Sequence, residues 1–451
     1  MPERQGLDRE DNSGGSVPPN QGGANAGGMD GPSVVEGARL AAPRLEPGRA
    51  YDRPKADRDA GGPLTAPALT VVWDDRFLHY DLGPDHPFTE RSRRLAVDLL
   101  RDALGDRAEE SVEWVRTIPP ANRALLEGFH DASYLDYVEL VSGQDVPIAL
   151  DAGDTPSFPG CYEEAARIVQ GAQAALDRVL HRGRPALHPA GGLHHAHADR
   201  ASGFCIFNDV ALAVDTAVRA GRRVAYLDID AHHGDGVMYG FYDSGRVLDI
   251  DFHQDGRTLF PGTGFPVESG RGDGAGLKVN VPLPPLAGDE ALLPLFRRLV
   301  PPLLRSFRPE VIVLQHGVDG HLGDALARLQ YTPAAYREID RTVVALAEEI
   351  SGGRLLVTGG GGYSARAVSR VLAASGLAAG RFPVPEDSAE VPADWKGRYR
   401  ELMGEPAPRT WADRLDPVPP SWRPEHEAKL IAELERVLGV RFPSAPDSER
   451  E

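Results

Sequence analysis

Residues 224–236 of this 451-residue chain read VAYLDIDAHHGDG, a short apolar run that turns abruptly into aspartates, histidines and glycines. The run Val224–Asp230 is almost continuously apolar, which is typical of a parallel strand covered on both faces. In parallel sheets, ligands bind beyond the carboxyl ends of the strands, where this polar cluster lies. The stretch therefore predicts a fold class and also where the chemistry is located.

The same pattern recurs along the chain. Further apolar runs predict strands at Thr70–Trp73, Val247–His253, Val311–His316 and Arg354–Thr358, and the segment 186–190 also leads into a glycine-rich motif. Between them, spacing typical of amphipathic helices occurs at Gly160–Leu180, Glu290–Phe307 and Pro333–Ile350. Alternation of strands and helices predicts an α/β sheet with right-handed crossovers.

The chain divides into three parts by composition. Residues 1–68 are rich in Gly, Pro, Asn, Asp and Arg and nearly free of aromatics, so we predict a disordered segment. Residues 69–382 carry the globular pattern. Residues 383–451 are rich in Pro and Trp and end in an amphipathic stretch near Pro424–Leu438, and we expect them to pack on the preceding domain as an extension.

Charge and cysteine content exclude some function classes. The net charge of −18 argues against a nucleic-acid-binding surface, which needs a basic face. It is compatible with lysine-rich partners, although acidity also serves solubility. Residues 1–68 carry no continuous apolar stretch that could serve as a signal peptide, and no run of 18 apolar residues occurs, so we expect no transmembrane helix. Two cysteines, Cys161 and Cys205, cannot form a disulfide framework, so we expect a reduced, cytoplasmic setting.

Asp230 and His232 are candidate metal ligands. Residues two apart in an extended chain point to the same side, so both side chains can reach one cation. Asp319, after another predicted strand, is the best third ligand. Three N and O ligands leave an open position, as in catalytic zinc sites. The alternative is that the aspartates cap helices and His232 lies in a turn.

Three other histidines are rival ligands: His233, His316 and His321. Their spacing from the candidate ligands places His233 and His316 on the opposite side of an extended chain. We expect structural or supporting roles for all three.

Two adjacent histidines, His194 and His195, follow a Gly-Gly-Leu turn. In amide hydrolysis, one imidazole can take a proton from the attacking water and return it to the departing amine. Each ring then needs an acidic partner to fix its tautomer, and Asp228 and Asp235 are available. A plain surface loop is the alternative, because His197 shows that this loop accepts histidines.

Tyr363 follows four consecutive glycines. Such a run is costly to order, which indicates that the backbone there is required. A phenol opposite a metal can donate a hydrogen bond to a developing oxyanion. A plain turn is the alternative, while a P-loop is excluded because no Lys-Ser/Thr pair follows.

Together these motifs resemble the histone deacetylase superfamily over roughly residues 70–380. The resemblance rests on Gly191–Ala196, Gly203–Asp209, Asp228–Val237, Phe260–Gly264 and Gly359–Tyr363. Within the superfamily, Gln315–Asp319 and Asp154–Gly160 are similar to the bacterial acetoin-utilisation branch.

The resemblance implies a three-layer arginase–deacetylase-type α/β fold, with a central, mostly parallel sheet of about eight strands flanked by helices. It also implies roles for individual residues. Zn²⁺ would be held by Asp230, His232 and Asp319. His195 with Asp235 would be the general base, and His194 with Asp228 its protonated neighbour. Tyr363 would polarise the carbonyl, and the substrate-binding positions would be Asp154, Gly203, Phe204, Phe260 and Gly361.

The activity implied is zinc-dependent removal of acetyl groups from lysine side chains of proteins. An acyl-CoA synthetase would be a substrate by analogy with the branch. Three alternatives stay open: an acetylpolyamine amidohydrolase, a longer-acyl-lysine amidohydrolase, and a silent acetyl-lysine-binding module. Fe²⁺ stays open as the alternative to Zn²⁺ in the cell. The family's K⁺ site would lie near Asp228 and Asp251, where a carboxylate stands at the position of a hydroxyl.

Overall fold

The computed structural model describes residues 67–413, 415 and 422–443. The predicted disordered segment 1–68 therefore lies outside the described residues, apart from its last two positions. Within the described ranges, no helix has the length and apolarity needed to cross a membrane.

Eight strands form one sheet, and every pairing between neighbours is parallel. The spatial order is β2-β1-β3-β8-β7-β4-β5-β6. In chain order the strands are β1 (Leu69–Val72), β2 (Val112–Val115), β3 (Ala186–His188), β4 (Val224–Asp228), β5 (Val247–Gln254), β6 (Lys278–Leu283), β7 (Val311–Gln315) and β8 (Leu355–Thr358). The predicted fold class is confirmed.

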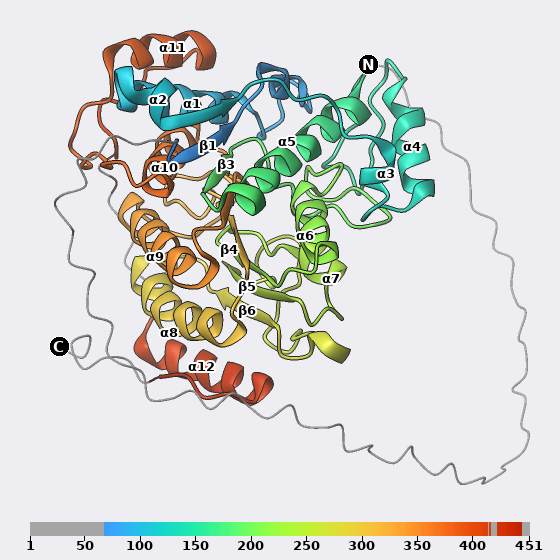
Figure 1. Ribbon diagram of the computed structural model, residues 1–451, viewed down its shortest axis with the longest axis vertical. Coiled ribbons are helices and arrows are strands. Elements are labelled where there is room, and N and C mark those ends of the chain that lie inside the picture. Colours follow the sequence, from blue (N-terminus) through green and yellow to red (C-terminus); the bar gives the residue numbers. More distant parts are fainter. Residues whose placement is uncertain (1–66, 414, 416–421, 444–451) are drawn as a thin grey trace, which may run out of the picture. The chain divides into compact units, whose positions relative to one another are not determined.

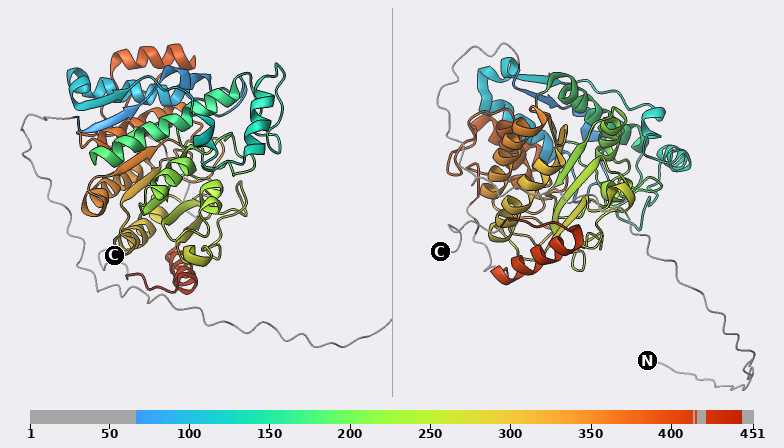
Figure 2. Two further views of the ribbon diagram at one scale, coloured as in Figure 1. Left: turned by 45° about the vertical axis from the view of Figure 1, so that its right-hand side comes forward. Right: turned by 60° about the horizontal axis from the view of Figure 1, so that its bottom comes forward.

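Helices cover both faces of this sheet (Figures 1 and 2). One face is packed by α1 (Arg91–Leu104), α8 (Asp289–Phe307), α9 (Pro333–Ser351) and α10 (Ala365–Ala379). The other is packed by α5 (Cys161–Arg182), α6 (Asp209–Arg219) and α7 (Asp235–Gly240). Each face has its own apolar core, as expected when strands are buried on both sides.

Smaller elements surround this three-layer unit. The α-helices are α2 (Ala108–Ser111), α3 (Arg123–Leu126), α4 (Ala132–Ser142), α11 (Ala393–Met403) and α12 (Pro424–Leu438). Within the described residues, 3-10 turns span Asp75–His79, Gly105–Arg107 and Gly272–Gly274. In the C-terminal part, α11 packs on α1, where buried Trp395 donates its indole N–H to the carbonyl oxygen of Leu95 at 2.8 Å.

Local sequence explains where the main elements begin and end. Helix α9 starts with the Thr332 hydroxyl accepting the N–H of Ala334, continues with Pro333 in its first turn, and ends at Gly352 in the left-handed conformation. Helix α6 begins where the Asn208 side chain accepts the N–H of Ala211. The predicted helices agree with the structure within one or two residues.

Four loops meet at one edge of the sheet, because strands β3, β8, β7 and β4 are neighbours and run in the same direction. The loops that leave their carboxyl ends are 189–195, 229–235, 316–319 and 359–363. They contain the two histidines, the three candidate ligands and the tyrosine. The topology thus brings together residues that are up to 169 positions apart, from His194 to Tyr363.

Candidate active site

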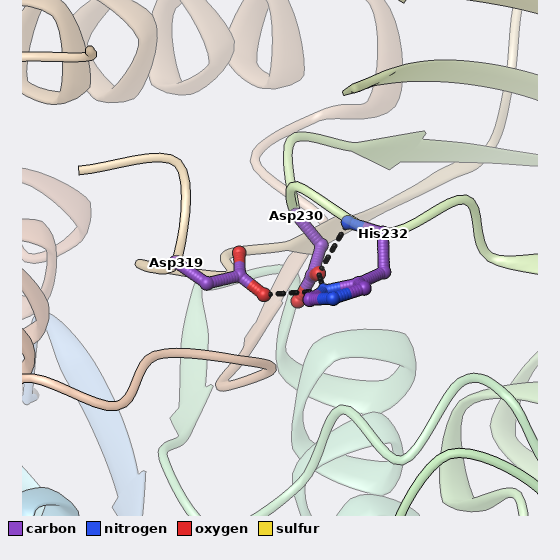
Figure 3. A group of neighbouring side chains, drawn as sticks. All are labelled: Asp230, His232 and Asp319. Atoms are coloured by element: carbon purple, nitrogen blue, oxygen red, sulfur yellow. Dashed lines mark hydrogen bonds and ion pairs between the residues drawn. The ribbon is translucent and has the colours of Figure 1, made fainter. Parts of the chain in front are cut away.

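Asp230, His232 and Asp319 converge in the buried centre of this edge (Figure 3). The Nδ1 atom of His232 lies 2.8 Å from Asp319 Oδ2 and 3.3 Å from Asp230 Oδ1. The expected extended conformation from Asp230 to His232 is wrong, because β4 ends at Asp228. A bend, closed by the His232 N–H donating to Asp230 Oδ1 at 2.9 Å, turns both side chains to the same point.

Backbone groups orient the two carboxylates. The N–H of Gly361 donates to Asp230 Oδ2 at 2.6 Å, and the N–H of Ala231 donates to Asp319 Oδ1 at 2.7 Å. A side chain at Gly361 would collide with the carboxylate of Asp319. Glycine is therefore needed there so that the backbone can approach both carboxylates closely.

The donor set fits a divalent metal ion. One imidazole nitrogen and two carboxylate oxygens lie within 4.8 Å of one another, and all three residues are buried. Burial disfavours the charged imidazole, but hydrogen bonds to Asp230 and Asp319 outweigh it and raise the pKa of His232 to about 10. The cluster therefore attracts positive charge strongly, and its N and O ligands suit catalytic zinc.

The two adjacent histidines each have a separate carboxylate. His194 donates from Nδ1 to Asp228 Oδ2 at 2.9 Å, and His195 donates from Nδ1 to Asp235 Oδ1 at 2.8 Å. Their Nε2 atoms lie 3.1 Å apart. All four side chains are buried, and Tyr226 adds a phenol hydrogen bond to Asp228 Oδ2 at 2.5 Å.

The surroundings give the two rings different charges. Burial disfavours protonation of His194, but the charges of Asp228 and Asp230 outweigh it and raise its pKa to about 10. Burial and then the charge of His194 lower the pKa of His195 to about 4. Near neutral pH, these shifts place a positive charge on His194 and leave the His195 ring neutral.

Residues to which the sequence analysis assigned no role hold the histidine loop in place. Asp209 accepts the N–H groups of Gly192 and Leu193, and Gln315 donates its amide to the Gly192 carbonyl. Asn208 donates to the carbonyl oxygen of His194 at 3.0 Å. The pair Asn208–Asp209 has the composition of a helix start, which was a usable signal, whereas the contact of Gln315 depends on the neighbouring strand.

Tyr363 lies beside the metal ligands. Its ring centroid is 6.4 Å from that of His232 and 5.9 Å from that of Phe204. Burial, followed by the charges of Asp319 and Asp230, raises the pKa of Tyr363 well above its ordinary value, so the phenol stays protonated and can donate. Asp324, which the sequence analysis did not single out, accepts the N–H of Tyr363 at 2.8 Å and fixes its backbone.

Phe204 and Phe260 have different neighbours in the site. The Phe260 ring centroid is 5.1 Å from that of His195, and the Phe204 ring packs edge-to-face on His86 at 4.5 Å. Phe260 is 42% exposed, so this part of the site faces solvent. A side chain at Gly203 would lie within 3 Å of both His195 and Phe260, which explains the glycine.

Asp154 lies in an exposed loop that approaches Phe204. Its carbonyl oxygen is 3.2 Å from Nε2 of His86, whose ring packs on Phe204. Asp151 organises the loop by accepting the N–H groups of Gly153, Asp154 and Thr155. The Asp154 carboxylate stays at the surface.

The rival ligands have partners elsewhere. His233 contacts the hydroxyl of Thr263 at 2.8 Å, and His316 contacts Asp340 at 2.9 Å. His321 accepts the N–H of Gly323 at 3.0 Å. In the described ranges, none of these rings belongs to the cluster of side chains that lie close enough together to share a metal ion.

The Asp251 carboxylate has protein donors on both oxygens. Gly234 donates its N–H to Oδ2 at 2.8 Å, and His253 donates from Nδ1 to Oδ1 at 2.6 Å. The Nε2 atom of His253 also faces an acceptor, the Gly264 carbonyl at 2.9 Å. Both oxygens of the Asp251 carboxylate are therefore engaged by protein donors, and the K⁺ site that the resemblance implies stays a prediction.

Comparisons with known proteins agree with this geometry. A family model described as the histone deacetylase domain matches residues 86–378. The acetoin utilization protein AcuC of Bacillus subtilis (strain 168) is 35% identical, over 81% of this chain and 96% of the relative. The AcuC protein of Staphylococcus aureus (strain MRSA252) is 32% identical, over 84% and 97%. The solved structure of the HDA15 HD domain matches with a TM-score of 0.64 at 23% identity, over 75% of this chain and 94% of the other, which shows a shared fold.

Proposed function

The chain belongs to the histone deacetylase family, in which it resembles the acetoin-utilisation branch, and we propose that it removes acetyl groups from lysine side chains of proteins. The observation that carries the proposal is the pair of adjacent imidazoles, each hydrogen-bonded to its own buried carboxylate, next to three metal-type ligands. A protein that only bound acetyl-lysine would need neither a base nor an oxyanion donor.

Zn²⁺ would be held by Asp230, His232 and Asp319, and when bound it supplies a Lewis acid that lowers the pKa of a water molecule. Neutral His195 takes a proton from the attacking water at Nε2. Its Nδ1–H bond to Asp235 holds the ring in the tautomer that leaves Nε2 free.

Charge that develops on the acetyl oxygen is stabilised by the Tyr363 phenol, which its raised pKa keeps protonated. The imidazolium of His194, held by Asp228, contributes a positive charge beside the base. The proton taken by His195 then passes to the lysine nitrogen as the C–N bond breaks. The products are acetate and free lysine.

Phe204 and Phe260 suit a linear substrate, because two aromatic rings can flank the methylene chain of acetyl-lysine while Asp154 at the surface holds its backbone. Resemblance to the acetoin-utilisation branch supports an acetylated acyl-CoA synthetase as the substrate in the cytoplasm. Acetylpolyamines and longer acyl-lysines use the same chemistry, so they are tested beside acetyl-lysine.

The test uses the purified full-length chain on an acetyl-lysine peptide, on N-acetylspermidine and on a long-acyl-lysine peptide. Acetate or fatty acid release is measured before and after treatment with a chelator, and after return of Zn²⁺ or Fe²⁺. His195→Gln should abolish release, whereas His181→Gln, at a histidine whose side chain is 74% exposed, should not change it.

Chelator-sensitive release from the acetyl peptide, restored by metal, supports the proposal. If the enzyme prefers acetylspermidine or the long-acyl peptide, the proposed substrate class is wrong, but the proposed hydrolytic mechanism still holds. Stoichiometric metal binding without any release would refute the enzymatic function.

A further inference from the structure

His197 is the third histidine of the catalytic loop, and the mechanism above does not use it. Its Nε2 atom lies 3.0 Å from Oδ2 of Asp235. His195 uses the other oxygen, Oδ1, at 2.8 Å. One buried carboxylate therefore bridges two imidazoles, and the second of them lies at the edge of the site with its side chain 13% exposed.

The direction of this hydrogen bond follows from the charge of Asp235. Burial opposes ionisation, but hydrogen bonds from His195 and His197 outweigh it and lower the pKa of Asp235 below its ordinary range. An ionised carboxylate only accepts, so His197 carries its proton on Nε2 and donates it. A hydrogen bond to a charged acceptor is among the stronger ones in proteins.

Three further contacts hold His197 in this position. The backbone N–H of His197 donates to the Arg200 carbonyl at 3.0 Å. Its carbonyl accepts from Nδ1 of His130 at 3.0 Å, since Nε2 of His130 is occupied by the N–H of Asn208. Its ring stacks on Tyr239, with centroids 6.3 Å apart and planes at 21°. A side chain on an unconstrained surface loop would not be fixed at both its backbone and its ring.

We propose that His197 is a positioning residue for the general base: it clamps the second oxygen of Asp235, and thereby fixes the Asp235–His195 hydrogen bond. The inference rests on the proposed function for its catalytic consequence. Without the clamp, the Asp235 carboxylate is free to rotate and to accept water from the nearby surface. The imidazole of His195 then loses the fixed orientation that its proton transfer needs.

Two variants separate the effect of losing the N–H donor of His197 from the effect of losing its aromatic ring. His197→Phe keeps a ring to stack on Tyr239 but removes the N–H, while His197→Gln keeps an N–H group at the same reach and removes the ring. We expect His197→Phe to lower kcat by about tenfold or more, the factor that loss of a charge-assisted hydrogen bond produces. KM should stay unchanged, because Asp235 does not touch the substrate, and His197→Gln should stay within about threefold of the wild type.

Proton NMR tests the hydrogen bond between His197 and Asp235 independently of enzymatic activity. The His195 Nδ1–H proton, held between ring and carboxylate, should give a far-downfield proton resonance, which is assigned by its loss in His195→Gln. His197→Phe should shift or broaden this resonance through exchange with water, and His197→Gln should leave it in place. His181→Phe is the matched control, since His181 is an exposed histidine on α5.

Wild-type kcat and an unmoved resonance in His197→Phe would overturn the proposal, as would an equal loss in His197→Gln, which would assign the effect to ring packing. If His197→Phe does not fold, His197→Asn replaces it, because its shorter amide does not reach Asp235 and the same losses are expected. Inactivity of the wild type on every acylated substrate would refute the proposed function alone, while the resonance would still support or overturn the clamp.

Discussion

Glu90 allows a quantitative prediction about stability. It precedes helix α1, is 1% exposed, and neither of its carboxylate oxygens has a hydrogen-bond partner among the residues that the structure describes. Burial raises its pKa from 4.5 to about 8, although the nearby charge of Arg93 opposes the shift. Near neutral pH, Glu90 is therefore held as the uncharged acid, and Glu90→Gln replaces it with a permanently neutral side chain of similar shape.

The sign follows from proton binding. Between pH 4.5 and about 8, the folded state keeps the Glu90 proton while the unfolded chain has lost it, so the free energy of unfolding falls as pH rises. At about 1.36 kcal/mol for each pH unit, the ceiling of this loss is about 5 kcal/mol, reached above pH 8. Glu90→Gln has no proton to lose at this position, so its free energy of unfolding should exceed that of the wild type by a margin that grows up to about pH 8.

Urea unfolding at several pH values from 5 to 9 measures the difference directly, because subtraction of the wild-type curve removes every other titrating group. Glu110→Gln, at an exposed position close by in the sequence, is the matched control and should follow the wild type. If the Glu90→Gln and wild-type curves stay parallel across this range, Glu90 is ionised in the folded protein and the reasoning is refuted.

Three further predictions concern the site. Tyr363→Phe should lower kcat by roughly 100-fold or more without loss of bound metal, because the oxyanion loses a donor, and near-normal turnover in a steady-state assay would contradict this. Gly361→Ala should bind metal far below stoichiometry, because its methyl group collides with the carboxylate of Asp319, and elemental analysis of the folded variant measures this. Asp324→Ala should lower kcat by about tenfold or more by releasing the N–H of Tyr363, and unchanged kcat would show that the glycine loop holds Tyr363 alone.

The fold could be predicted where strands are continuously apolar, and less well where they are not. Strands β4, β7 and β8 in the middle of the sheet were evident from sequence. Strands β2 and β6 were missed, because Glu113 interrupts the first, and Lys278 and Asn280 interrupt the second. Lys278 is fully buried, with its ammonium donating to the Val247 carbonyl at 2.8 Å, a contact that no local pattern indicates.

For the site, sequence reasoning indicated which loops carry chemistry but not how their side chains pair. The rule that ligands lie beyond strand ends was sufficient to nominate Asp230, His232 and Asp319. Asp324 lies 39 residues from its hydrogen-bond partner in the sequence, and His197 lies 38 residues from its partner. Such hydrogen bonds depend on the order of strands in the sheet, which the pattern of one chain does not specify.

The dependence on strand order also explains how two adjacent histidines come to have different surroundings. His194 faces Asp228 and lies 3.9 Å from Asp230, so its surroundings favour the imidazolium. His195 faces Asp235, which divides its hydrogen-bonding capacity between His195 and His197, and it lies next to the positive charge of His194. Environments that push the pKa values of neighbouring groups apart identify the acid and the base of a site. By that criterion we propose His195 as the base, held in position by His197 through Asp235.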